Sequence, residues 1–104
     1  MNPAQKIIEA ANDLVLEARR ANSFFERAAL QALAATLAND LRDLADRCVG
    51  PRGDLHARLD DYRAHVAAAL GFADDAGRDA EQHRLWALGA LSSFEHALDE
   101  YRAG

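Results

Sequence analysis

The chain has 104 residues, enough for one small domain, and it carries a net charge of −5. Half of its residues are hydrophobic, but 24 residues are alanine and 14 are leucine, whereas valine, isoleucine and threonine together number only 6. Because β-branched residues are the usual material of strands, this composition excludes a β-sheet core. We therefore expect one all-α domain over residues 1–104.

The first helix is predicted to begin at Asn2 and Pro3 and to run to about Ala21. An asparagine side chain can accept a hydrogen bond from an unpaired helical amide, and proline tolerates the first helical position. Leu16 falls on the polar side of this helix. The predicted buried stripe has spacings of three and four and consists of Ile7, Ala11, Leu14, Val15 and Ala18.

The second helix is predicted to begin after Ser23 and to reach about Cys48. Ser23 and Glu26 fit a capping box, in which each side chain satisfies the other residue's backbone amide. A narrow leucine seam, centred on Leu37, is expected to face the core: Leu30, Leu33, Leu37, Leu41, Leu44 and Cys48. The alanines beside it, Ala34, Ala38 and Ala45, would permit close approach of a neighbour.

An alternative joins the first and second helices into one unbroken helix of over 40 residues. A 4-3 repeat of apolar residues continues from Ile7 to Ala35, straight through the expected break. We favour the break because Asn22 and Ser23 interrupt the pattern with residues typical of helix caps.

The third helix is predicted between the loop at residues 50–53 and Gly71, with Asp54 as its cap. Its predicted inward residues are Leu55, Leu59, Tyr62, Val66 and Leu70.

The last helix is predicted to begin between Asp75 and Asp79 and to reach about Arg102, with Gln82 donating to an Asp79 cap. Its predicted apolar arc is Ala80, Ala87, Ala90, Leu91, Phe94, Ala97, Leu98 and Tyr101. Because short connections make neighbouring helices antiparallel, the four helices predict a small up-and-down bundle.

Arg78 and His83 are the candidate catalytic pair. Their spacing resembles the Arg, polar residue, then His motif of the HEPN family of small helical ribonucleases, which place it at the start of a late helix. The resemblance implies a guanidinium that stabilises charge on a phosphate and an imidazole that transfers a proton at a ribose 2′-hydroxyl. The pair converges only if Arg78 lies outside the helix, and Arg58 with His65 is a second match to the spacing.

No metal or other cofactor is expected. A metal or haem bundle needs several histidines and glutamates on inward positions of different helices, whereas only His83 lies within the apolar arc of its helix. We expect His83 at the rim of the bundle, hydrogen-bonded to a neighbouring carbonyl or carboxylate.

The last helix also carries a stripe of small or weakly polar residues: Leu85, Gly89, Ser92 and His96, with Trp86 beside it. Glycine inside a helix costs about 1 kcal/mol relative to alanine, so Gly89 indicates either a closely approaching helix or an exposed position that tolerates glycine. Ser92, His96 and Asp99 share a face, but a mid-helix serine lacks the free amides that a hydrolytic triad needs.

The distribution of charge bears on partners and location. Residues 1–53 hold 7 basic and 7 acidic groups, while residues 54–104 hold 5 and 10, which argues against nucleic acid or an anionic membrane as the main partner. The longest uncharged stretch has 12 residues, short of the roughly 20 that span a bilayer. With no signal-peptide pattern and a lone Cys48, we expect a cytoplasmic protein, and an arginine-to-lysine ratio of 11 to 1 suggests a bacterial one.

The leading hypothesis is a small, non-catalytic adaptor or regulatory protein that binds a protein partner or forms a homodimer. It depends on large apolar residues that remain after the inner faces are filled: Leu16, Phe24, Phe72, Leu85 and Trp86. The predicted contact surface is Leu85, Trp86, Gly89, Ser92 and His96. The alternative is an RNA-cleaving toxin that uses Arg78 and His83.

Overall fold

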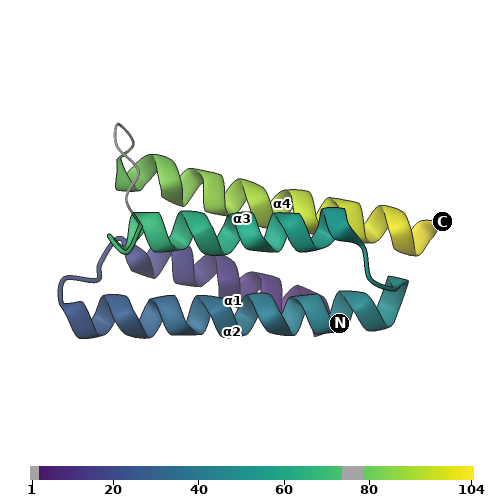
Figure 1. The fold of residues 1–104 in the computed structure, drawn as a ribbon, viewed down its shortest axis with the longest axis horizontal. Helices are drawn as coiled ribbons and strands as arrows, with labels where there is room; N and C mark the ends of the chain where they lie inside the picture. Colours follow the sequence, from purple (N-terminus) through teal and green to yellow (C-terminus); the bar gives the residue numbers. More distant parts are fainter. Residues whose placement is uncertain (1–2, 74–78) are drawn as a thin grey trace.

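The computed structural model describes residues 3–73 and 79–104, which form four α-helices in an up-and-down bundle (Figure 1). The helices are α1 (Pro3–Ala18), α2 (Phe24–Val49), α3 (Gly53–Ala69) and α4 (Ala80–Ala103). Successive helices run in opposite directions, and α4 packs against α3 most extensively and also returns to α1 (Figure 1). The described residues include no strand, so the predicted all-α bundle is confirmed.

The first two helices are separate, as the capping pattern predicted. Ser23 has extended backbone angles, φ −122° and ψ 159°, and its hydroxyl accepts a hydrogen bond from the amide of Glu26 at 3.1 Å. An unbroken helix would need helical angles at Ser23, so the single-helix alternative is wrong. The first helix ends at Ala18, earlier than the expected Ala21.

The buried face of α2 differs from the predicted leucine seam. Of that seam only Leu41 is fully buried, whereas Leu33 is 48% exposed and Cys48 is exposed. The other members are partly buried: Leu30, Leu37 and Leu44. The alanines beside the seam face the core instead: Ala34, Ala38 and Ala45. Because their side chains are small, α2 can lie close to its neighbours on this face, and Leu37 is at the edge of the core rather than its centre.

Glycines with positive φ end two of the helices. Gly50, with φ 80°, follows α2, and Gly71, with φ 88°, follows α3. After α3 the amide of Gly71 donates to the carbonyl of Ala68 and that of Phe72 to the carbonyl of Ala67, at 3.1 and 2.8 Å. This pair of bonds satisfies two carbonyls that the helix leaves open, so the chain turns away at Gly71 as expected.

The predicted helix starts are confirmed at one aspartate and wrong at another. The carboxylate of Asp79 accepts a hydrogen bond from the amide of Gln82 at 2.8 Å and caps α4. Asp54 is not a cap, because α3 begins at Gly53 and places Asp54 in its first turn, where a carboxylate still favours the helix dipole. The expected cap at Asn2 and the alternative start at Asp75 lie outside the described residues.

The core contains the whole predicted stripe of α3: Leu55, Leu59, Tyr62, Val66 and Leu70. Most of the stripes predicted for α1 and α4 are also buried, although Ile8 rather than Ile7 is the more deeply buried isoleucine, and Ala80 and Tyr101 are exposed at the ends of the α4 arc. The described helices include none that is both long enough and apolar enough to cross a membrane.

Candidate functional site

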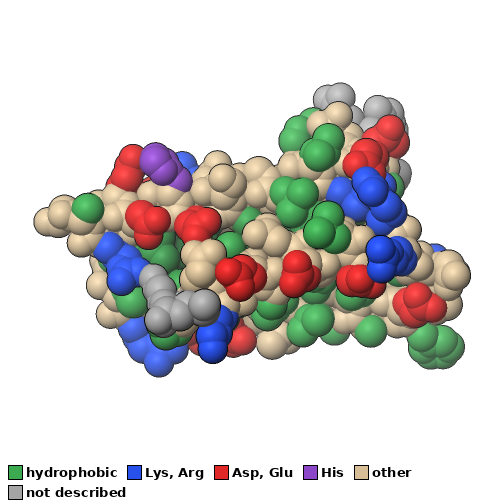
Figure 2. Space-filling model, turned by 180° about the vertical axis from the view of Figure 1, so that it is seen from behind, with side chains coloured by type: hydrophobic (Ala, Val, Ile, Leu, Met, Phe, Trp, Pro, Cys, Tyr) green, Lys and Arg blue, Asp and Glu red, His purple; other side chains and the backbone are tan. Residues whose placement is uncertain are grey.

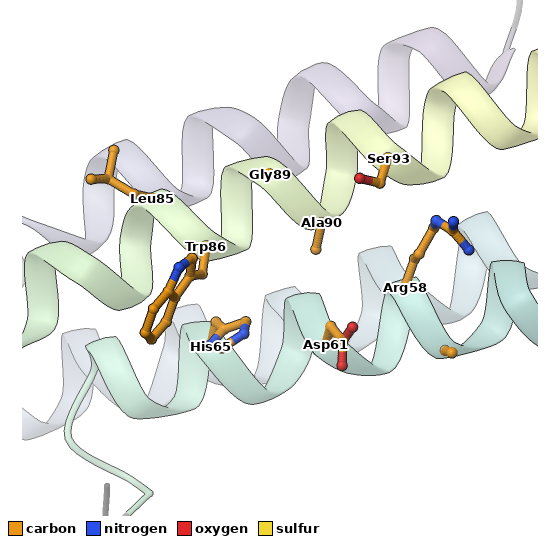
Figure 3. A pocket seen from close by; sticks show the side chains of 9 residues that line it. Arg58, Asp61, His65, Leu85, Trp86, Gly89, Ala90 and Ser93 are labelled. Carbon is orange, nitrogen blue, oxygen red and sulfur yellow. The ribbon is translucent and has the colours of Figure 1, made fainter. Parts of the chain in front are cut away.

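A groove runs along the surface between α3 and α4 and contains several of the residues selected from the sequence (Figure 3). Its α4 wall includes Leu85, Trp86 and Gly89. The complete lining is Ala57, Arg58, Asp61 and His65 from α3, and Leu85, Trp86, Gly89, Ala90 and Ser93 from α4. In Figure 3 the indole of Trp86 reaches from α4 toward His65 at one end of the groove, while the side chain of Arg58 extends from α3 at the other end. Both helices therefore contribute to this surface.

Large apolar side chains stand beside small ones along the α4 wall. Leu85 is 54% exposed and Trp86 is 36% exposed. A Cβ atom built on Gly89 would meet no atom of the described residues within 4 Å, so close packing against another described helix does not explain this glycine. Next to Leu85 and Trp86 the helix surface is thus shallow and open.

The aromatic rings of two histidines and a tryptophan pack together at the end of the groove that lies away from Arg58. The ring centroids of His65 and His83 lie 5.3 Å apart, and the Trp86 ring lies 5.3 Å from His65 and 5.4 Å from His83. His83 is 3% exposed, which confirms its predicted inward position. The Trp86 indole is therefore supported by side chains of both helices.

The two imidazoles contact each other through their Nδ1 atoms at 3.1 Å. One Nδ1 must carry a hydrogen and the other must present its lone pair, so the rings hold opposite roles at this contact. The sequence predicts a carbonyl or carboxylate beside His83, and the structure places the imidazole of His65 against its Nδ1 atom. The described residues contain no group of three or more ligating side chains that could hold a metal ion.

Two predicted contact residues lie outside the groove lining. Ser92 and His96 are exposed on α4, and His96 Nε2 lies 3.0 Å from the Oε1 atom of Glu100. Sequence reasoning missed the α3 wall, in which His65 precedes the buried Val66. A signal was present, since His65 flanks the apolar stripe of α3, but its proximity to α4 depends on how the bundle assembles.

The candidate catalytic pair gains no support from this geometry. Arg78 lies outside the described residues. The imidazole of His83 is 3% exposed and contacts both His65 and Trp86, so it is closed off from a ribose hydroxyl arriving from solvent. The second match, Arg58 and His65, lines the groove from α3, where seven residues separate the two backbone positions by about 10 Å along the axis.

A second exposed apolar cluster lies at the end of the bundle where α1 connects to α2. The Phe24 ring contacts Phe25 and Phe72 edge to face, with centroids 5.9 and 6.0 Å apart. All three side chains are exposed, the most being Phe25 at 82%. The exposure predicted for Phe24 and Phe72, as for Leu16, Leu85 and Trp86, is thereby confirmed.

Charged side chains tie the helices together at the surface. Arg19, in the turn that follows α1, donates to both carboxylate oxygens of Glu81 on α4, at 2.8 and 2.9 Å, and Arg84 pairs with the same carboxylate. The hydrogen bonds from Arg84 and Arg19 lower the pKa of Glu81. Figure 2 shows acidic side chains along the middle of one face of the molecule and basic side chains toward the two ends of that face. 

Comparisons of the chain with protein-family models, with curated proteins and with solved structures gave no match.

Proposed function

We propose that this chain is a small, non-catalytic interaction module that acts as an adaptor or regulatory protein and associates with itself through the groove between α3 and α4. The observation that carries the proposal is the exposure of Leu85 and Trp86 beside the open surface at Gly89. Fully burying a large apolar side chain contributes about 1.5–3 kcal/mol, and a partner would gain the part of this that corresponds to the areas of Leu85 and Trp86 that are still exposed.

The placement of Trp86 supports the same proposal. Exposed tryptophans at interfaces contribute most when they are held in place before binding, because less side-chain entropy is lost. Here the indole packs against the rings of His65 and His83. Trp86 is thus an apolar anchor of the groove, held in position before a partner binds.

Measurement of mass in solution, by light scattering over a hundredfold range of protein concentration, tests self-association. The natural chain of 11.3 kDa should increase in mean mass with concentration. The variant Leu85→Ser should remain monomeric over the same range. Leu16→Ser is the matched control, since Leu16 lies on α1 and is 57% exposed, close to the 54% of Leu85.

Circular dichroism should show that both variants retain the helical fold. A natural chain that stays at 11.3 kDa at the highest concentration contradicts self-association. If Leu16→Ser abolishes association and Leu85→Ser does not, the surface is on α1 and the groove is the wrong site.

A further inference from the structure

We infer that the occupant of the groove is α4 of a second copy, lying antiparallel to the first α4 with a two-fold axis at Gly89. The inference rests on the proposed self-association and specifies its register. In this arrangement each residue faces the one equally far from Gly89 in the opposite direction, so Leu85 faces Ser93 of the second copy and Trp86 faces Ser92 of the second copy.

The sizes of the facing side chains favour this register. On the N-terminal side of Gly89 the exposed face of α4 presents the bulky Leu85 and Trp86, and on the C-terminal side it presents the small Ser92 and Ser93. An antiparallel pair places bulky against small on both sides of the axis. A parallel pair would set Trp86 against its own copy and leave the serines facing each other across a gap, which loses packing.

Gly89 fits the position on the axis. The two helices come closest there, and a residue without a side chain lets their backbones approach. Within residues 3–73 and 79–104 of one chain, no atom lies within 4 Å of a Cβ built on Gly89. A second copy of the same glycine would account for a residue that otherwise costs helix stability.

The charges at the groove permit a second copy in spite of the net charge of −5, since the α3 wall carries one charge of each sign, at Arg58 and Asp61. Arg84 and Glu95 lie off this face of α4, and the stripe that would meet the second copy consists of uncharged residues and a histidine: Gln82, Leu85, Trp86, Gly89, Ser92, Ser93 and His96. Two such stripes can meet without burying like charges. The acidic residues lie beyond the stripe, and the register brings Asp79 toward Asp99 of the second copy at each end.

The small size of this helix–helix interface limits the affinity of the dimer. Residues 82–96 cover about 22 Å of helix, and with the α3 wall they amount to fewer residues than the 20–30 per partner of a standard interface. We therefore expect a weak, reversible dimer. Because acidic ends approach each other, raising NaCl from about 0.05 to about 0.5 M should screen the repulsion and lower the dissociation constant several-fold.

Disulfide trapping tests the register, in a Cys48→Ser background that removes the exposed native cysteine. Gly89→Cys should cross-link with itself on mild oxidation. A mixture of Leu85→Cys and Ser93→Cys should form the mixed dimer, identified by mass, because the Ser93→Cys partner keeps its own Leu85 and the disulfide retains even a weakened pair, while each variant alone should cross-link slowly. Positions eight residues apart are separated by about 12 Å along antiparallel helices, beyond the reach of a disulfide.

Leu16→Cys in the same background is the control for random collision, since Leu16 is exposed on α1. Self-cross-linking of Leu85→Cys and of Ser93→Cys, each alone, would indicate parallel helices and overturn this inference while leaving the groove as the interface. Cross-linking at α4 no faster than in the control, in a chain that light scattering shows to dimerise, also overturns the inference. A monomeric natural chain overturns both the inference and the proposed self-association.

Discussion

His65 on α3 and His83 on α4 share a hydrogen bond between their Nδ1 atoms, 3.1 Å apart, and both rings contact Trp86. Because the bond needs one donor and one acceptor, it holds only while at least one Nδ1 lacks a hydrogen. The contact joins the two walls of the groove at the position of its apolar anchor. Its strength therefore bears on how rigidly Trp86 is presented.

A double-mutant cycle on this pair should show strong coupling. His65→Phe removes the Nδ1 partner of the buried His83 and should cost about 1–3 kcal/mol, since a buried polar atom loses its hydrogen bond. The double variant with His83→Phe should lose less unfolding free energy than the two single variants lose together. The difference, which is the coupling energy of the pair, should be at least about 0.5 kcal/mol. Urea denaturation at pH 7 measures all four proteins, and additive losses would show that the contact contributes nothing.

Tyr62→Phe should destabilise the bundle by about 0.5–1.5 kcal/mol. The phenol of Tyr62 is fully buried and donates to the carbonyl of Ala11 at 3.0 Å, which links α3 to α1, and burial raises the pKa of this phenol. Tyr101→Phe is the control: its phenol donates to Asp54 at 2.9 Å, but at an exposed site. Equal losses of unfolding free energy in urea for the two variants would contradict the assigned role of Tyr62.

The phase of α2 can be tested with two leucines of the predicted seam. Leu41→Ala removes a side chain that is 0% exposed and should cost about 2–5 kcal/mol. Leu33→Ala, at a position 48% exposed, should change the free energy of unfolding by less than about 1 kcal/mol. Thermal and urea unfolding check both values. A larger loss at Leu33 than at Leu41 would show that the leucine seam of α2 faces the core, as the sequence predicted.

Stability should depend on pH through Glu81. Its pKa is lowered in the fold by hydrogen bonds from Arg84 and Arg19, so the ionised carboxylate stabilises the folded state above the carboxyl's unfolded pKa. This contribution is lost as the pH falls through the lowered, folded value. Glu81→Gln should therefore decrease the Tm modestly at pH 7, and the difference from the natural chain should disappear in acid.

Glu9→Gln is the matched control for Glu81, because Glu9 is exposed and forms no ion pair among the described residues. Its Tm should stay equal to that of the natural chain at pH 7. A difference at Glu81 that persists unchanged in strong acid would show that the substitution acts through packing and not through charge.

Several features of the fold could be predicted from local patterns. The stripe of α3 was predicted completely, because its large apolar residues at Leu55, Leu59, Tyr62, Val66 and Leu70 leave only one face to bury. The caps at Ser23 and Asp79 were also predicted, since each depends on a side chain bonding to an amide three residues away. Interactions this short in sequence do not need the other helices.

The candidate site was predicted only in part. The sequence indicated Leu85, Trp86 and Gly89 from the spacing along one helix, and these residues do line the groove. The α3 wall, with His65 and Asp61, was missed, because a period of 3.6 residues places side chains on a helix but says nothing about which other helix lies beside them.

The rotation of α2 shows what only the tertiary structure decided. Its leucines and alanines form two stripes offset by one residue, so Leu37 and Ala38 differ by about 100° around the axis and both stripes satisfy the helical period. Local sequence determined that this segment is an amphipathic helix with ends at defined caps. Which stripe is buried depends on how closely the neighbouring helices can pack, and in the bundle the small side chains of Ala34, Ala38 and Ala45 face inward while Leu33 remains exposed.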